Sequence, residues 1–310
     1  MRILSAARGA FERAGTGKTR MKAAALLAAF LLAFTMERAF AAETRTAAVL
    51  NVTVTSPWLG LLVNFIGGVN VKVTAIQDWN DDGELVRRIR ARNLQELPAG
   101  TLLMAFDFRD AKGLGLPFEH YENYHSLYSE LPLAEDKIDA SLSDPSVVPF
   151  IAQRVLTVLA DWDPGNYPYY QRRLAELQAR LYSSILAGRQ MLKDQPVYDL
   201  TGHSSALLQA VGCALARPSS EEWTAWSAWK EIPLLTATVS RQAENRTVVV
   251  VDYSTPKAIR SSLASNSAVF LFARPKIDQD YPAFLHDQYI SLWGKITSRP
   301  LPPPARRRAQ

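Results

Sequence analysis

The sequence predicts an α/β protein of two lobes, each a parallel sheet flanked by helices, bridged by one long helix. Three observations support this prediction. Short β-branched segments alternate with amphipathic segments before residue 166, and the same alternation restarts after residue 194. Between them, apolar residues keep one helical spacing throughout. Alternating strands and helices favour parallel strands with crossover helices, so each end of the chain is expected to build its own sheet.

The first lobe is predicted to span residues 42–165. Its opening strand, VLNVTVT, stops at Ser56-Pro57, and the helix after it stops at Gly67-Gly68, a typical helix end. We expect the elements in this order: a strand at 49–55, a helix at 59–66, a strand at 71–76, a basic helix at 83–94, a strand at 101–106, and a helix from Asp144 to about Leu159.

Residues 166–194 are predicted to form the linking helix. Pro168 suits its first turn, where the missing N–H of proline has no intrahelical partner to lose. The apolar stripe has helical spacing throughout and consists of Tyr170, Leu174, Leu177, Leu181, Ile185 and Leu186. This is long for a globular helix, which indicates a structural connector.

The second lobe is predicted to span residues 195–296. Its expected elements are a strand at 197–200, a helix at 204–215, a strand at 247–252, a helix at 256–264, a strand at 269–272 and a helix at 281–293. Trp223, Trp226 and Trp229 recur every three residues. Either a helix packs them against its own lobe, or they line a ligand cleft as apolar cover. The sequence leaves their role open.

Residues 1–41 are predicted to be a cleaved secretory signal peptide. Lys22 precedes a short apolar run, and Ala39-Phe40-Ala41 supplies small residues at the positions that signal peptidase requires. The run is shorter than the roughly 20 residues of a membrane span. Met21 is an alternative start. The mature chain is therefore expected in the periplasm, and the proline-rich basic segment 297–310 is expected to be a disordered tail.

Composition and charge exclude several classes of protein. The 310 residues are 48% hydrophobic, which excludes a disordered or collagen-like chain. Seven of the 35 basic and two of the 30 acidic residues lie within 1–41, so the rest of the chain carries 28 of each. A neutral body argues against nucleic-acid binding. Cys213 is the single cysteine, so it forms no internal disulfide, and its apolar neighbours predict a small buried hydrophobe.

Four segments give the chain a resemblance to a known family. They are VTVTSPWLGLLVNFIGGVNVKV, LSDPSVVPFIAQRVLTVLADWDPGNYPYYQRRLAELQARL, QPVYDLTGHSSALLQAVG and VVVVDYSTPKAIRSSLASNSAVFLF. Together they resemble the metal-binding solute-binding proteins of ABC importers, of the zinc and manganese type. The most specific piece is the Asp163-Pro164 turn that leads into Tyr169-Tyr170 and a leucine-rich helix. The resemblance implies two lobes bridged by a rigid helix.

The chain departs from this family at the ligand positions. The resemblance implies three histidines and one carboxylate, a donor set that suits zinc. The first position falls in the loop QDWNDDGELV, near Gly83–Leu85, which has no histidine, and the second falls on Ala140. The third falls on Thr201 or, with a two-residue shift, on His203. The fourth falls on Arg274, so a fixed cation stands where a carboxylate is expected.

Two hypotheses for the ligand site follow. In a rearranged metal site, His203, Asp81 and Asp82 bind one zinc or manganese ion, although an acidic loop of this kind is more often a solvated surface. In a non-metal site, Arg274 pairs with an anionic or organic ligand. The residues expected to line the cleft in either case are Trp58, Glu84, Thr201, Arg274 and Asp278.

The function expected from the resemblance is capture of a divalent metal ion, zinc or manganese, between the lobes. The partner would be the membrane permease of an ABC importer, and the protein is expected to act as a monomer. The alternative is a diverged paralogue that binds an organic or anionic ligand, or a periplasmic accessory protein. We expect no enzyme, because Ser204 and Ser205 adjoin His203 on one helix and no G-x-S-x-G motif is present.

Overall fold

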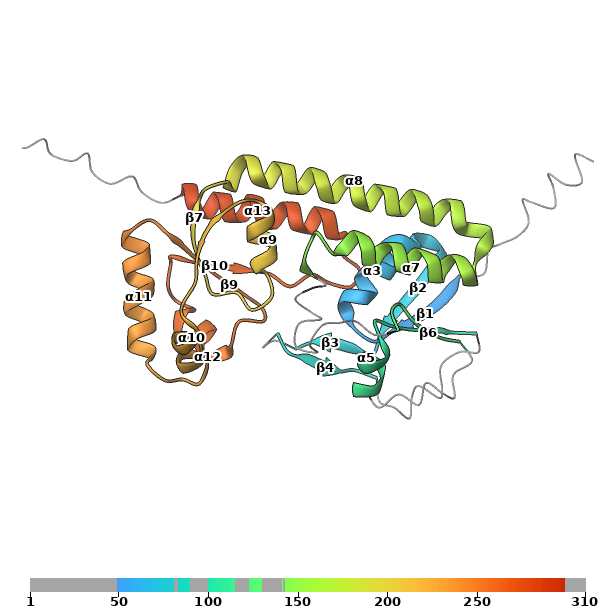
Figure 1. Ribbon diagram of the computed structural model, residues 1–310, viewed down its shortest axis with the longest axis horizontal. Coiled ribbons are helices and arrows are strands. Elements are labelled where there is room, and N and C mark those ends of the chain that lie inside the picture. Colours follow the sequence, from blue (N-terminus) through green and yellow to red (C-terminus); the bar gives the residue numbers. More distant parts are fainter. Residues whose placement is uncertain are drawn as a thin grey trace, which may run out of the picture. The chain divides into compact units, whose positions relative to one another are not determined.

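The computed structural model describes residues 49–80, 83–89, 100–114, 123–129, 141 and 143–298. The predicted signal peptide 1–41, nearly all of the predicted tail, and Asp81 and Asp82 lie outside these residues. Within them, the expected α/β fold with parallel sheets and one long helix is confirmed (Figure 1). No helix in this part of the chain combines the length and the apolar character that a membrane crossing requires.

Both lobes use the same strand order. The first sheet consists of β1 (Leu50–Val54), β2 (Val71–Ala75), β5 (Leu102–Ala105) and β6 (Tyr124–Ser126), in the order β2-β1-β5-β6. The second consists of β7 (Pro196–Asp199), β8 (Ala214–Ala216), β9 (Val248–Asp252) and β10 (Val269–Phe272), in the order β8-β7-β9-β10. All the pairs are parallel. The order therefore reverses between β1 and β5 and between β7 and β9, and ligands of open α/β sheets bind at such points.

Helix α3 (Pro57–Gly67) forms the centre of the first lobe. All its residues except Asn64 are buried, which explains why its sequence is apolar on every side. The Oγ of Ser56 accepts a hydrogen bond from the Leu59 N–H at 3.2 Å and caps the helix. The lobe also contains α5 (Phe108–Gly113), α7 (Val148–Trp162) and the short 3-10 turns η1 (Gly68–Asn70) and η4 (Pro164–Asn166).

The second lobe packs three helices on one face of its sheet. These helices, α10 (Ser220–Ser227), α11 (Ile232–Glu244) and α12 (Lys257–Leu263), share a buried core with the sheet; it contains Tyr198, Leu200, Trp226, Leu235, Val239, Val249, Val251, Ile259 and Leu263. The lobe also contains α9 (Ser205–Ala210) and α13 (Tyr281–Thr297). The sequence did not predict α11.

Helix α8 (Tyr167–Leu192) is the predicted linking helix, with Pro168 in its first turn. Its 26 residues span about 39 Å at the usual rise per residue. In Figure 1 it runs past α7 and α3 of the first lobe and then alongside α13. The α8–α13 contact is close at Gly188, where a Cβ atom would lie 2.6 Å from Val211 and 2.8 Å from Tyr289.

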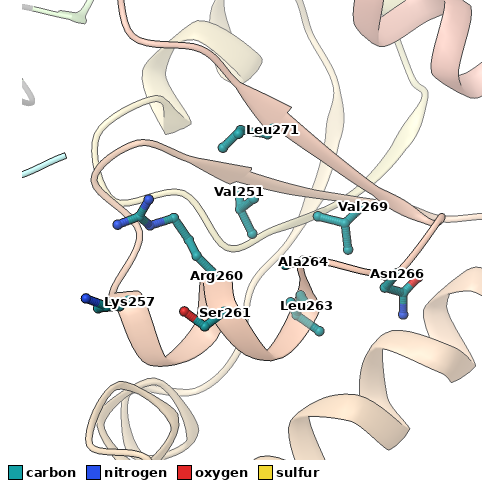
Figure 2. Close-up of a pocket in the computed structure, with 9 residues that line it drawn as sticks. All are labelled: Val251, Lys257, Arg260, Ser261, Leu263, Ala264, Asn266, Val269 and Leu271. Atoms are coloured by element: carbon teal, nitrogen blue, oxygen red, sulfur yellow. The ribbon is translucent and has the colours of Figure 1, made fainter. Parts of the chain in front are cut away.

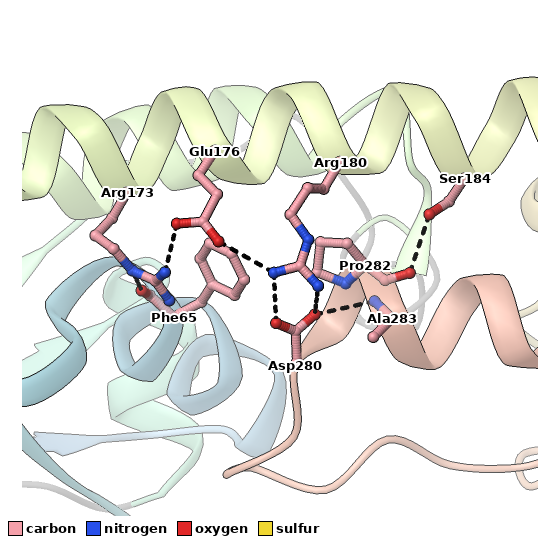
Figure 3. A network of polar contacts seen from close by, with 8 residues as sticks. All are labelled: Phe65, Arg173, Glu176, Arg180, Ser184, Asp280, Pro282 and Ala283. Atoms are coloured by element: carbon pink, nitrogen blue, oxygen red, sulfur yellow. Dashed lines mark hydrogen bonds and ion pairs between the residues drawn. The ribbon is translucent and has the colours of Figure 1, made fainter.

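Charged side chains of α8 connect the helix to both lobes (Figure 3). Arg173 donates to the Phe65 carbonyl of α3 at 2.9 Å and lies over the Phe65 ring. Arg180 makes two hydrogen bonds, of 2.7 and 2.8 Å, to Asp280, the N-cap residue of α13. Glu176 bonds to both arginines. Because these side chains are partly exposed, each pair contributes on the order of 1 kcal/mol or less.

The prediction of a helix at 83–94 is wrong for residues 83–89, which the structure describes. Instead, β3 (Gln77–Trp79) pairs antiparallel with β4 (Leu85–Arg87) as a hairpin. The turn is closed by the Gly83 N–H, which bonds to the Asn80 carbonyl at 3.0 Å, and Gly83 has a φ of 78°. Glycine adopts that angle without strain, so the N-D-D-G sequence favours a turn over a helix. Residues 90–99 lie outside the described part.

The helix predicted at 204–215 is shorter than expected. It ends at Ala210, and Gly212 adopts a φ of 77°, so the chain turns and Ala214–Ala216 joins the sheet as β8.

The three tryptophans do not share one environment. Trp226 is fully buried, whereas Trp229 lies after α10 and is 58% exposed. Cys213 is half-buried, and burial raises the pKa of its thiol to about 12, which favours the predicted inert role.

Two helical glycines provide a test of the α8–α13 packing. We expect Gly188→Ala to lower the free energy of unfolding by about 1–2 kcal/mol, because overpacking outweighs the better helix propensity of alanine. Gly294→Ala in α13 has open space around its Cβ and should raise the same quantity by about 0.5–1 kcal/mol. Urea unfolding of residues 42–310 measures both. Equal stabilisation by both variants would contradict the close packing at Gly188.

Candidate functional site

The candidate pocket takes its walls from both lobes. It has a volume of about 290 Å³ and lies where the strand order reverses between β7 and β9. The hairpin β3–β4 supplies one wall and the loops after β7 and β9 supply the other. Its lining residues are Trp79, Gly83, Glu84, Leu85, His203, Ser254, Thr255, Pro256 and Lys257. A crevice at the carboxyl ends of parallel strands, at a switch point, is the expected position of a ligand site.

Asp252 organises the second-lobe wall. It is fully buried at the end of β9, and its carboxylate accepts the N–H groups of Gly202, His203 and Ser204 at 3.0, 2.9 and 2.8 Å. Its Oδ1 also accepts from the Ser254 N–H at 3.1 Å. Burial raises the pKa of Asp252, but the backbone N–H groups outweigh that effect and hold the pKa below its ordinary value. The carboxylate is therefore charged, and it fixes both loops.

His203 is held in the pocket by its backbone. Besides its bond to Asp252, its carbonyl accepts the Ser143 hydroxyl of the first lobe at 2.9 Å. Its ring meets the Tyr253 ring edge-on, with centroids 6.2 Å apart. The Nδ1 atom is buried and has no hydrogen-bond partner among the described residues. A buried imidazole nitrogen without a partner is unfavourable, so His203 brings an unsatisfied polar atom to the pocket wall.

The hairpin wall is shaped by its turn. The Asn80 side chain donates to Glu84 Oε2 at 3.1 Å and accepts from the Glu84 N–H at 2.9 Å. The first bond holds the Glu84 side chain and the second holds its backbone, so both fix Glu84 in the pocket wall. Glu84 and His203, two of the side chains predicted for the cleft, therefore line the same cavity.

Aromatic rings fill the space between the lobes beside the pocket. Trp58 is 2% exposed and contacts Trp79 and Tyr281 at centroid distances of 5.9 and 5.8 Å. Its indole N–H donates to the hydroxyl of Tyr253 at 3.2 Å, and the Trp79 and Tyr253 rings lie 5.6 Å apart. Trp58 was predicted to line the cleft; the structure places it in the packed contact between the lobes, behind the pocket wall.

The other predicted residues lie in separate places. Thr201 is buried, with its N–H and hydroxyl bonded to Asp199 at 2.9 and 2.6 Å. Arg274 donates to the carbonyls of Trp79 and Asn80. Asp278 lines a different pocket, of about 410 Å³, beside α3 and α8. Asp81 and Asp82 lie outside the described residues, so the structure does not place them.

The donor set within the described ranges does not make a complete metal site. No group of three histidine, cysteine, aspartate or glutamate side chains there converges closely enough to hold an ion. His203 and Glu84 supply two candidate donors in the pocket. A tetrahedral zinc site needs two more ligands from residues or solute.

Sequence reasoning missed the roles of Tyr253, Asp252 and Lys257. The signal was present in TVVVVD-Y, because a polar residue that directly follows a buried strand lies at the carboxyl edge of the sheet. Without the strand order, however, nothing showed that β9 neighbours β7. The link between Asp252 and His203 was therefore not visible.

A third pocket, of about 360 Å³, is lined by second-lobe residues (Figure 2). It has an apolar floor on β9 and β10, formed by Val251, Val269 and Leu271, and Lys257 and Arg260 extend from α12 beside it. Its lining residues within the described part of the chain all belong to the second lobe.

Solved structures share this fold. The crystal structure of ZnuA is 18% identical, with a TM-score of 0.57, and the match covers 79% of this chain and 98% of that one. The laminin-binding protein Lmb of Streptococcus agalactiae, described as an adhesin with metal-transporting activity, is 13% identical over 80% and 99%, with a TM-score of 0.57. The Pseudomonas aeruginosa solute-binding protein FpvC, in complex with Mn²⁺, is 13% identical over 80% and 98%, with a TM-score of 0.54.

No protein-family model matches the chain. No curated protein matches it either. At such low identity the structural likeness establishes the fold, and the resemblance inferred from the sequence is confirmed at that level.

The role of Asp252 is testable through pH. The Asp252→Asn variant replaces a charged acceptor of several N–H groups, so we expect the free energy of unfolding at pH 7 to fall by about 2–4 kcal/mol. Because the folded-state pKa is lowered, the wild-type carboxylate contributes stability above about pH 4 and loses it as the pH falls through the folded pKa. The Asp252→Asn variant should not show the part of the acid-induced loss of stability that comes from protonation of Asp252.

Urea unfolding from pH 7 to pH 2.5 measures both effects. The control is Asp161→Asn on the exposed surface of α7, which should change stability by less than about 0.5 kcal/mol. If Asp252→Asn behaved like this control, the carboxylate would not be what organises the two loops.

Proposed function

We propose that this chain is an exported solute-binding protein that delivers its solute to the membrane permease of an ABC importer. The observation that carries the proposal is the pocket lined by both lobes at the β7/β9 switch point. The shared fold supports it, because each of the compared structures is matched over nearly its whole length. The predicted signal peptide and periplasmic location belong to the same proposal, as does a monomeric state without catalytic activity.

The proposed solute is a divalent metal ion, zinc or manganese. Support comes from the donor chemistry: the His203 imidazole and the Glu84 carboxylate line the pocket, and Asp81 and Asp82 directly precede Gly83 in the sequence. Imidazole and carboxylate are common ligands of both ions. One solved structure with this fold is a ZnuA variant with zinc bound, and another is FpvC with Mn²⁺.

A second candidate is an organic or anionic solute, or an accessory role without a metal. The observation that favours it is the positive charge beside the pocket. Lys257 lines the cavity, and the guanidinium of Arg274 binds the carbonyl of Trp79, which is also a lining residue. Two fixed cations oppose a divalent ion by Coulomb repulsion unless carboxylates compensate for it.

Titration of the metal-free mature chain, residues 42–310, with Zn²⁺ and Mn²⁺ tests the proposal. We expect one ion per chain by calorimetry and native mass spectrometry. His203→Ala should weaken that affinity by at least about tenfold, because a direct ligand matters at least as much as its supporting partners. The matched control is His286→Ala on α13, which does not line the pocket and should leave the affinity unchanged.

The results of these measurements discriminate between the two candidate solutes. Equal affinity in His203→Ala and the wild-type protein would remove His203 from the site. A wild-type protein that binds neither ion would contradict the metal proposal. An organic adduct on protein purified from its own periplasm would then establish the second candidate.

A further inference from the structure

The pocket exists only if the hairpin β3–β4 stays against the second lobe. The hairpin supplies Trp79, Gly83, Glu84 and Leu85, and the loops after β7 and β9 supply the facing residues. In a two-lobed binder the facing walls can be brought together by the solute itself. In this chain, contacts between its own residues hold the two walls together.

Arg274 is the polar bridge between the two walls. It follows β10 in the second lobe, and its Nη1 donates to the carbonyls of Trp79 (3.1 Å) and Asn80 in the hairpin. Two carbonyl oxygens that converge on one donor make a small negative site. A guanidinium group suits such a site because it is always charged and its donors have fixed geometry. This cation is covalently attached, so the bridge does not depend on a captured ion.

Backbone packing next to Arg274 shows how close the walls are. Gly83 faces the Tyr253 carbonyl so closely that a Cβ atom would overlap that oxygen. The Trp79 and Tyr253 rings are in edge contact, and the hydroxyl of Tyr253 accepts the Trp58 indole N–H. Apolar burial and one charged bridge therefore act on the same hairpin. None of these contacts involves a solute.

We propose that Arg274 is the positioning residue of the pocket: it holds the hairpin β3–β4 on the second lobe, so that the pocket is formed before the solute arrives. This inference rests on the proposed function, because it describes how the same pocket takes up its solute. Solute then enters a preformed cavity, and binding needs no closure of one lobe on the other.

The distance between one spin label on the hairpin and one on a helix of the second lobe tests the inference. The labels are attached through Arg87→Cys on β4 and Glu244→Cys on α11, both exposed positions, in a Cys213→Ala background. The wild-type pair, measured by pulsed electron resonance without metal, should give one narrow distance distribution. Addition of Zn²⁺ should leave it unchanged. Arg274→Ala should broaden it and shift it to longer distances.

Two further variants control for a general loss of structure. Lys276→Ala removes one charge from an exposed position in the same loop and should keep the narrow distribution. Arg274→Lys keeps the charge without the planar fork and should give an intermediate distribution. Hydrogen exchange adds a local readout: in Arg274→Ala the Gly83 and Asn80 amides should exchange about tenfold or more faster, while those of β9 keep their rates.

A broad metal-free wild-type distribution that narrows with Zn²⁺ would overturn the inference, because the solute would then be what brings the walls together. A narrow distribution in Arg274→Ala would overturn it as well. Failure of the proposed function is distinguishable, because the metal-free distances are read without any solute. A protein that bound no metal could still show the Arg274-dependent bridge.

Discussion

The packing of helix α8 against both lobes is the constraint on which the rest of the structure depends. Its buried stripe contacts α3 and α7 at one end, and Gly188 lets α13 approach closely at the other. One continuous helix therefore contacts elements of both lobes. Interactions that would be weak in isolation, such as the partly exposed Arg180–Asp280 pair, then act on surfaces that are already positioned.

Polar groups fix the walls of the pocket through the hydrogen bonds that they make with nearby loops. Asp252 is buried and charged, and the N–H groups of two loops satisfy it. Arg274 donates to two carbonyls of the hairpin, those of Trp79 and Asn80. Neither Asp252 nor Arg274 is among the residues that line the cavity. Their effect is to place His203 and Glu84, which line the cavity, at its opposite walls.

In this protein the fold and the residues that line the pocket favour different kinds of solute. The fold is that of solute-binding proteins whose solved structures include zinc- and manganese-bound forms. The pocket, in contrast, combines one imidazole and one carboxylate with the lysine Lys257, and an arginine lies directly behind Trp79. A fold can host several ligand chemistries, so the pocket's own charges must decide the solute.

The sequence by itself determined the elements whose signals are local. The stripe from Tyr170 to Leu186, the turn at Gly67-Gly68 and the β-branched strands predicted α8, α3 and most of both sheets, because hydrophobic period and chain breaks are encoded in adjacent residues. Only the tertiary structure decided the hairpin at Gly83 and the site. The pocket joins residues more than a hundred positions apart, and which loops meet depends on strand order and on packing between lobes, which no local pattern encodes.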